Sequence, residues 1–353
     1  MTPGPAWPLR TARWAAAVLA GYGALALWWV AGGPYPWAVP GNPDSTFRDH
    51  WLADVPAGVV EAVTLVVTGA ALLALAAMHR DLAGRWRRVV VTIGAGTAVL
   101  LVLVLPGNLS LFLIPVFNLL PAKRVAWPEV HVVLLASAGF ALALTTLAYA
   151  RRTGGRCEEC GRGARPGWSR ARWIRVGRTS AYVATVAPLG YAVIRLLWAA
   201  GVPVGATEEF LADLRAANEG NGTVLMELAL ATMATGGGLL CFGLTRPWSE
   251  SWPRWVLGLA GRPVPRWFPT GLATLCGVGL FGFASLLVPD LLRFLGGETV
   301  YYPGTRVRTT WLSHVPEVAL MVWSVAVLVS ALAFHYRTQP ACRFCSRVTV
   351  PVG

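Results

Sequence analysis

The feature of the sequence that most constrains its fold is the recurrence of apolar runs about as long as a bilayer is thick. Crossing roughly 30 Å of hydrocarbon takes about 20 residues of α-helix, and the chain contains eight runs of that order. They cover residues 14–31, 57–78, 88–106, 129–150, 179–200, 223–244, 268–288 and 315–336. The sequence therefore predicts an all-α polytopic membrane bundle of eight transmembrane helices.

The composition agrees with a membrane protein and excludes an ordinary soluble domain. Hydrophobic residues make up 55% of the chain and charged residues only 13%, whereas soluble domains carry about 25% charged residues. The net charge of +13 does not indicate nucleic-acid binding, because the basic residues recur in short clusters between the apolar runs. A shorter apolar segment, 109–120, contains Pro115 and Asn118, so we expect it to be re-entrant or interfacial.

The distribution of arginine predicts how the chain is oriented. Basic residues concentrate before the first apolar run and after the second, fourth, sixth and eighth runs, whereas the opposite loops carry fewer of them alongside several acidic residues. The basic clusters are Arg10–Arg13, Arg80–Arg88, Arg151–Arg178, Arg246–Arg266 and Arg337–Arg347. By the positive-inside rule, we expect a multi-pass protein of the cytoplasmic (inner) membrane with both termini in the cytoplasm.

The two halves of the chain resemble each other. The stretch GYGALALWWVAGGP (Gly21–Pro34) matches GYAVIRLLWAAGVP (Gly190–Pro203) at a constant offset. The fourth and eighth runs both open with Pro-Glu-Val, at Pro128 and Pro316, and both are followed by a Cys-x-x-Cys motif. We interpret the chain as a tandem duplication of a four-helix unit, and the even number of spans in each unit makes the repeats parallel.

The duplication predicts four segments. Residues 1–156 form the first four-helix half, 157–178 a cytoplasmic linker rich in arginine and cysteine, 179–341 the second half, and 342–353 a cytoplasmic tail. The pattern of Gly-Tyr followed by Trp and Ala-Gly-x-Pro in the first and fifth runs resembles uncharacterised multi-pass integral membrane proteins of actinobacteria. That resemblance implies no particular activity.

Polar side chains inside the apolar runs are candidates for an interior path, because charges are costly in hydrocarbon. The candidates are Glu61, Thr64, Thr68, Glu129, Arg195, Glu227 and Glu317. Glu61, Thr64 and Thr68 share one helix face at i, i+3 and i+7. Arg195 should pair with Glu227 or Glu61; the alternative is that it snorkels to the outer interface. Glu129 and Glu317 directly follow prolines, so they also fit the first turn of a helix, where a carboxylate favours the dipole.

Three histidines are predicted to lie on the outer side, close to acidic residues. They are His50, His131 and His314. Such a cluster can bind a divalent cation or relay protons, although interfacial histidines are often scattered without a shared role. The sequence contains no phosphate loop, dinucleotide fingerprint or His-Glu-x-x-His helix.

The two Cys-x-x-Cys motifs predict a metal site on the cytoplasmic side. They are Cys157 with Cys160, after the fourth run, and Cys342 with Cys345, after the eighth. A disulfide is disfavoured because the cytosol keeps thiols reduced, and redox catalysis is disfavoured because Glu158 and Glu159, rather than cations, lie between the first two cysteines. Four thiolates satisfy tetrahedral zinc, so we expect one structural zinc ion. The alternatives are two free dithiols and a thiol switch.

Three functional hypotheses follow. The first is a transporter-like or channel-like module with an acidic interior stripe. The second is a non-transporting membrane scaffold or metal or redox sensor with a four-cysteine zinc site. The third is an enzyme that acts on lipid at the outer face. The expected partners are membrane lipids and a protein on the cytoplasmic face, not nucleic acid.

Overall fold

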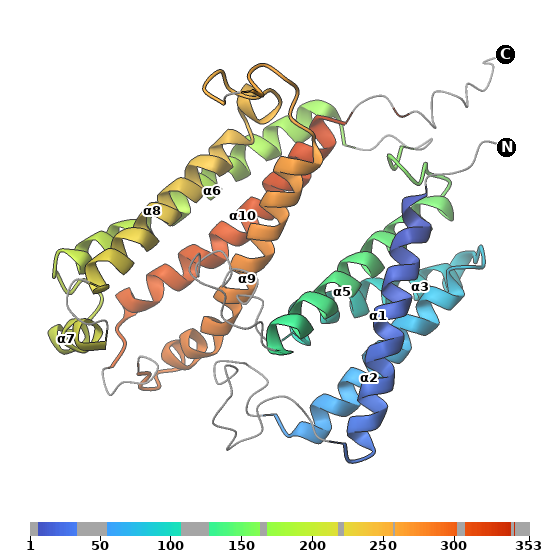
Figure 1. Ribbon diagram of the computed structural model, residues 1–353, viewed down its shortest axis with the longest axis horizontal. Coiled ribbons are helices and arrows are strands. Elements are labelled where there is room, and N and C mark those ends of the chain that lie inside the picture. The colour runs from blue at the N-terminus through green and yellow to red at the C-terminus, as the bar shows by residue number, and fades with distance from the viewer. Residues whose placement is uncertain are drawn as a thin grey trace. The chain divides into compact units, whose positions relative to one another are not determined.

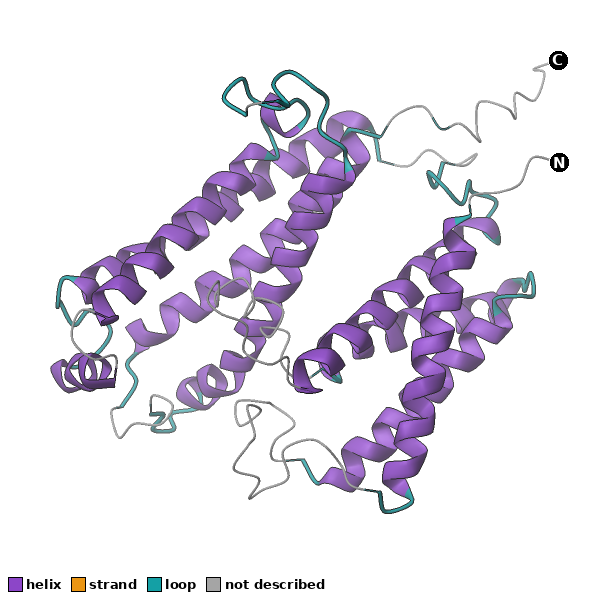
Figure 2. Cartoon of the chain, viewed as in Figure 1, coloured by secondary structure: helices purple, strands orange, loops and turns teal. Residues whose placement is uncertain are grey.

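The computed structural model describes residues 6–33, 55–106, 127–162, 168–217, 222–256, 258–301, 308–339 and 342. Within these ranges the chain is helical, and the β pairing consists of two isolated bridges (Figure 2). The chain divides into two compact units, each described by itself below. Unit 1 contains Met1–Gly167 together with Gln339–Gly353, and unit 2 contains Trp168–Thr338.

In the part of unit 1 that the structure describes there are four long helices, whose arrangement is shown in Figure 1. They are α1 (Trp7–Val30), α2 (Ala57–Ala77), α3 (Gly84–Val99) and α5 (Trp127–Arg152), and α3 continues into a π-helical turn, η1 (Leu100–Val104). Helices α1 and α3 each pack against both α2 and α5. The core between them consists mainly of alanine, leucine and valine side chains, which lets the four helices approach closely.

The described residues of unit 2 also form four long helices, together with a short one. They are α6 (Arg170–Ala199), α7 (Glu208–Ala217), α8 (Gly222–Gly243), α9 (Trp267–Leu295) and α10 (Val315–Arg337), with two 3-10 turns, η3 (Pro247–Ser249) and η4 (Trp311–His314). Helices α6 and α10 pack along each other, α8 packs against α6, and α9 packs against α10.

Glycines allow these helices to come close. A Cβ atom at Gly139 of α5 would lie 2.7 Å from Val102, and one at Gly238 of α8 would lie 2.9 Å from the carbonyl oxygen of Thr185 in α6. Helices in a bilayer gain little from hydrophobic burial against one another, so they associate through close van der Waals contact at small residues. Gly139 and Gly238 are therefore packing positions.

Seven helices of the described residues are long and apolar enough to cross a membrane, so the multi-pass helical character expected from the sequence is supported. They span Gly58–Ala77, Gly84–Val104, Val130–Arg152, Arg170–Ala199, Gly222–Gly243, Trp267–Ser285 and Val315–Arg337. Helix α1 forms where the first crossing is predicted, but it is not among these seven. An eighth crossing by α1 stays a prediction.

Several helices begin or end away from the bounds of the apolar runs. Helix α3 begins at Gly84 rather than at 88, and α6 begins at Arg170 rather than at 179. Ser169 caps α6 by accepting a hydrogen bond from the backbone N–H of Arg172. The sequence pattern did not predict α7. The segment 109–120, expected to be re-entrant or interfacial, lies outside the described residues.

Corresponding helices make similar contacts in the two units. If α1, α2, α3 and α5 are matched in order with α6, α8, α9 and α10, the pairs α1–α2, α1–α5 and α3–α5 correspond to α6–α8, α6–α10 and α9–α10. The contact between α2 and α3 has no counterpart of similar extent between α8 and α9. The shared pairs are what a duplication would produce, and the duplication itself stays a prediction.

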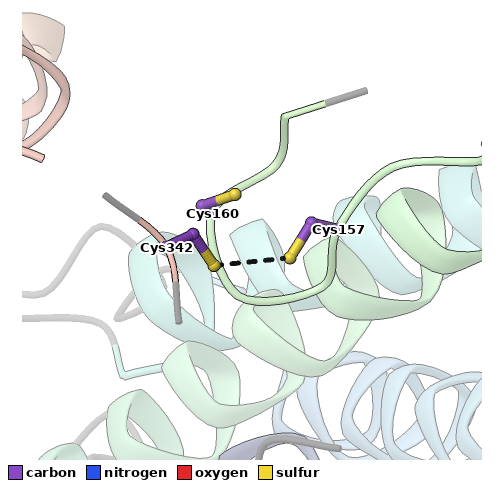
Figure 3. Close-up of side chains that lie close together, drawn as sticks. All are labelled: Cys157, Cys160 and Cys342. Atoms are coloured by element: carbon purple, nitrogen blue, oxygen red, sulfur yellow. Dashed lines mark hydrogen bonds between the residues drawn. The ribbon is translucent and has the colours of Figure 1, made fainter. Parts of the chain in front are cut away.

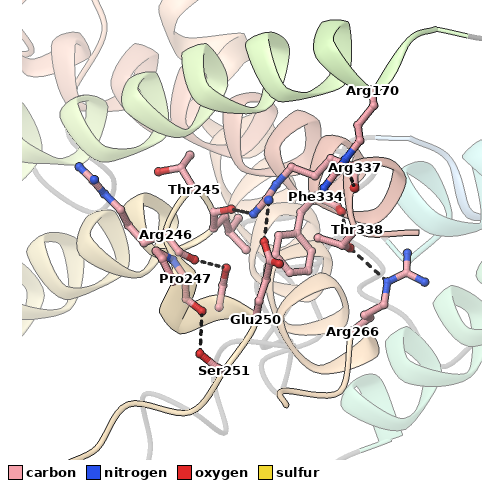
Figure 4. A network of polar contacts seen from close by, with 12 residues as sticks. Arg170, Thr245, Arg246, Pro247, Glu250, Ser251, Arg266, Phe334, Arg337 and Thr338 are labelled. Atoms are coloured by element: carbon pink, nitrogen blue, oxygen red, sulfur yellow. Dashed lines mark hydrogen bonds and ion pairs between the residues drawn. The ribbon is translucent and has the colours of Figure 1, made fainter. Parts of the chain in front are cut away.

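Arginine side chains tie the segment between α8 and α9 to the end of α10 (Figure 4). The guanidinium of Arg337 pairs with the Glu250 carboxylate at 2.7 Å and donates to the carbonyl oxygen of Leu244 at 2.7 Å. Arg266 donates to the carbonyl oxygen of His335 and to the hydroxyl of Thr338. These contacts give Arg337 and Arg266 partners within unit 2.

Candidate metal centre

The first Cys-x-x-Cys motif forms a tight turn shortly after α5 ends. The backbone N–H of Gly161 donates to the carbonyl oxygen of Cys157, and the N–H of Cys157 donates to that of Arg162, both at 2.8 Å. The N–H of Arg162 also lies 3.5 Å from the Cys160 sulfur. Gly161 has a φ of +73°, a left-handed value that glycine adopts at little steric cost. The turn therefore fixes the backbone that carries the first two thiols.

A buried arginine of α5, Arg151, holds this turn through hydrogen bonds to its backbone. Nη1 of Arg151 donates to the carbonyl oxygens of Glu158 (2.9 Å) and Glu159 (3.2 Å), and its side chain is only 9% exposed. A Cβ atom on Gly161 would lie 2.9 Å from Nε of Arg151, so glycine is also needed there for space. The arginine distribution predicted only a topology signal at Arg151, so this role was missed. Its place in the last turn of a helix, just before the motif, was the available signal.

Two further segments of unit 1 meet at the same turn. Nε1 of Trp7, the first residue of α1, donates to the Glu159 carboxylate at 2.6 Å. Nε2 of Gln339, at the start of the C-terminal segment, donates to the carbonyl oxygen of Cys160 at 3.2 Å. The cysteine turn thus joins the beginning of α1, the end of α5 and the C-terminal segment.

Three cysteine sulfurs converge at this point (Figure 3). The sulfurs of Cys157, Cys160 and Cys342 all lie within 4.8 Å of one another, and those of Cys157 and Cys342 are 3.8 Å apart. Cys160 and Cys342 are buried and Cys157 is half-buried. All three are reduced cysteines and all belong to unit 1, which takes in the C-terminal segment. Cys345, the fourth predicted ligand, lies outside the described residues.

The spacing of the sulfurs suits a metal ion bound by thiolates. Zinc–thiolate bonds of about 2.3 Å in a regular tetrahedron place neighbouring sulfurs about 3.8 Å apart, and the distance between Cys157 and Cys342 agrees with that edge. Three soft sulfur ligands favour zinc over magnesium or calcium, which prefer oxygen. The three described cysteines therefore lie close enough together to bind one metal ion.

No protein family, curated protein or solved structure matches this chain. The interpretation of its sites therefore rests on their own geometry. The resemblance to uncharacterised membrane proteins of actinobacteria stays a prediction.

The predicted pairing of Arg195 with a glutamate is present in unit 2. Nη1 of Arg195 in α6 lies 3.2 Å from both carboxylate oxygens of Glu227 in α8, and Glu227 is completely buried. The guanidinium also lies over the rings of Tyr191 and Trp198, 4.7 and 4.8 Å from their centroids. The partner is Glu227 and not Glu61. This ion pair compensates the charge of Glu227 and links α6 to α8.

The polar groups in the predicted stripe of α2 are in different states: the two threonine hydroxyls are engaged within the helix, whereas the Glu61 carboxylate is not engaged in the part of the chain that the structure describes. The hydroxyls of Thr64 and Thr68 are buried and donate to carbonyl oxygens of their own helix, those of Val60 and Thr64, at 2.7 Å. Glu61 is half-buried and has no hydrogen bond or ion pair among the described residues. The two threonines therefore face the interior of unit 1 as the helical spacing predicted, but their hydrogen-bonding groups are already occupied.

Of the three histidines predicted to lie on the outer side, the two that the structure describes have separate sets of partners. His131, in unit 1, lies 3.0 Å from the Tyr22 hydroxyl through Nδ1. His314, in unit 2, lies 2.7 Å from the Glu317 carboxylate through Nδ1 and is 3% exposed. His50 and the side chain of Glu129 lie outside what the structure describes. In the described ranges, the cysteine group is the one set of three or more potential metal ligands that lie within reach of one another.

Proposed function

We propose that this chain is a multi-pass membrane scaffold or sensor in which a structural zinc ion holds the C-terminal segment to unit 1. The observation that supports this proposal best is the convergence of Cys157 and Cys160 with Cys342, a residue that follows the last helix of unit 2. Cys345 supplies the fourth thiolate, because it repeats the Cys-x-x-Cys spacing of the first pair. The positive-inside rule puts the site in the cytoplasm.

The surroundings of the thiols favour a structural site over a catalytic one. Two of the three described cysteines are buried, and the turn is held by Arg151, Trp7 and Gln339. Structural zinc sites have four protein ligands and no open position, whereas catalytic sites keep a position for water or substrate. Four thiolates therefore leave no room for a reaction at the metal.

Zinc occupancy would decide whether the C-terminal segment is attached to unit 1. Structural metal sites contribute directly to folding free energy, so loss of the ion releases the ligands it joins. The segment carries Arg343 and Arg347, which would become accessible to a partner on the cytoplasmic face. A scaffold would hold zinc permanently, whereas a sensor would lose it at a physiological zinc concentration.

Metal analysis of the purified full-length protein tests the site. We expect about one zinc ion per chain, and its loss when Cys157, Cys160, Cys342 or Cys345 is changed to serine, since each supplies one of four ligands. Removing the zinc with a chelator should speed trypsin cleavage after Arg343 and Arg347. Cys276→Ser is the control, because Cys276 lies in α9 and is not part of the cluster. Protein that purifies without zinc, or that keeps it in Cys342→Ser, would refute the proposal.

The other two hypotheses have less support from the described residues. Transport would need accessible polar groups, but Glu227 is paired with Arg195 and the hydroxyls of Thr64 and Thr68 bond their own helix. An outer-face enzyme would need His131 and His314 to act together, whereas each has its own partner within a different unit. Both hypotheses stay predictions.

A further inference from the structure

We propose that the exposed face of the first turns of α6 binds the headgroups of anionic phospholipids. This inference does not depend on the zinc site. It rests on the length of α6 and on the contrast between its packed face and its exposed face. It also rests on Arg175 and Arg178, which have no hydrogen bond or ion pair among the described residues.

Helix α6 is longer than a membrane crossing requires. It has 30 residues, whereas about 20 are enough to cross the hydrocarbon core. The apolar run at 179–200 supplies that length by itself. The first turns, Arg170–Arg178, therefore extend beyond the hydrocarbon into the zone of the lipid headgroups.

One face of these first turns packs on α10. The ring of Trp173 stacks on that of Tyr336 with centroids 4.6 Å apart, and a Cβ atom on Gly177 would lie 3.1 Å from Cβ of Ala333. Each residue advances about 100° around a helix, so Arg172, Arg175 and Arg178 point away from α10, and all three are exposed. One face of these first turns therefore packs on protein, whereas the opposite face carries exposed positive charges.

The arginine face continues down the helix as a face for lipid. Tyr182, Val186 and Val193 fall in the same angular sector and are 46%, 63% and 54% exposed in unit 2. Exposed apolar side chains on a membrane-spanning helix contact acyl chains. Arg178 is one helical turn, or about 6 Å along the axis, from Tyr182. A phospholipid whose chains cover this face therefore has its phosphate at the level of Arg175 and Arg178.

These arginines are available to a phosphate. Arg175 and Arg178 have no hydrogen bond or ion pair in the part of the chain that the structure describes, and Arg172 lies over the ring of Trp168 at 4.1 Å. In contrast, Arg337 and Arg266 at the same end of unit 2 are occupied by protein partners (Figure 4). Guanidinium groups bind phosphates in bidentate fashion, and basic clusters next to membrane helices bind anionic lipids.

Native mass spectrometry of the purified full-length chain tests this site. The probes are phosphatidylglycerol and phosphatidylcholine with identical acyl chains. We expect the protein to retain phosphatidylglycerol preferentially. Each arginine at a membrane surface is worth about a fivefold change in affinity, so Arg175→Gln/Arg178→Gln should lower phosphatidylglycerol affinity roughly 25-fold and leave phosphatidylcholine binding unchanged. Arg175→Lys/Arg178→Lys should keep most of the preference, because it keeps the charges.

The matched control removes two other exposed arginines. Arg254 and Arg262 lie between α8 and α9, and neither side chain has an ion pair among the described residues. Arg254→Gln/Arg262→Gln therefore changes the net charge equally away from α6. Equal retention of the two lipids by the unmodified protein, or an equal loss in both glutamine pairs, would overturn the proposal. Should the α6 glutamine pair not fold, the single variants Arg175→Gln and Arg178→Gln test it at about a fivefold loss each.

Discussion

Among single residues, substitutions of Arg195 and Glu227 have the most clearly predictable effect on stability. Arg195→Gln leaves the fully buried Glu227 without its cation, and breaking a buried ion pair in this way costs about 3–5 kcal/mol. We expect a large drop in the thermal stability of the detergent-solubilised protein, measured by fluorescence-detected size exclusion after heating. The double variant Arg195→Gln/Glu227→Gln should recover most of it, because it removes both charges together.

An exposed ion pair provides the comparison. Arg293 and Glu298 lie 2.9 Å apart, with side chains 56% and 58% exposed, so solvent screens this pair and Arg293→Gln should have little effect on thermal stability. A double variant at Arg195 and Glu227 that is no more stable than Arg195→Gln would contradict the pairing. So would equal losses at Arg195 and Arg293.

The residues that could be predicted are those whose chemistry needs a partner. A charge inside an apolar run must be compensated, which led to the pairing of Arg195. Arg151 and Trp7 could not be predicted in this way, because their contacts with the cysteine turn are to backbone carbonyls and to a surface glutamate. Nothing in their spacing specifies those partners. The participation of Cys345 and the identity of the metal stay predictions.

At the level of elements, the contact between α6 and α8 depends on one glycine. A Cβ atom at Gly238 would lie 2.9 Å from the Thr185 carbonyl oxygen, whereas one at Gly236 would meet nothing within 4 Å. Alanine favours a helix over glycine by about 1 kcal/mol. We therefore expect Gly236→Ala to raise the thermal midpoint slightly and Gly238→Ala to lower it by forcing the helices apart. A Gly238→Ala variant as stable as Gly236→Ala would show that the two helices do not pack closely there.

Helix existence was easier to predict from the sequence than helix length. Apolar runs mark the part of a helix that lies in hydrocarbon, but backbone hydrogen bonding continues into polar residues, so α3 and α6 begin earlier than their runs. Helix α7 was missed because it is short and its apolar residues are few. Phe210, Leu211 and Leu214 lie on one face of it and pack against Ile194 and Trp198 of α6. That amphipathic spacing was the available signal.

For the whole molecule, the orientation in the membrane is the main prediction. We propose eight crossings with both termini in the cytoplasm, from the arginine distribution. Reporter domains fused after Gly41, Gly161 and Gly220 should read outside, inside and outside. Gly161 follows the first cysteine pair, so its reporter also places the metal centre. The opposite pattern, or a cytoplasmic reading at Gly41, would exclude a crossing by α1 or invert the whole arrangement.

The division of the chain into units could be predicted only in part. The repeated sequence pattern suggests two sets of four helices, and the described residues of each unit form four long helices. From their position in the sequence, residues 342–353 were predicted to be a separate tail, because they follow the second four-helix half. Their grouping with unit 1 depends on contacts such as that of Gln339 with Cys160, which no local pattern specifies.

That grouping has a consequence for how the protein is made. Unit 1 consists of residues from both ends of the chain, so its cysteine centre cannot be completed while the ribosome is still translating unit 2. All of the described helices are translated before Cys342, so the centre closes only after translation has passed the end of α10. A product truncated before Cys342 would keep the thiols of Cys157 and Cys160 without the third member of the group.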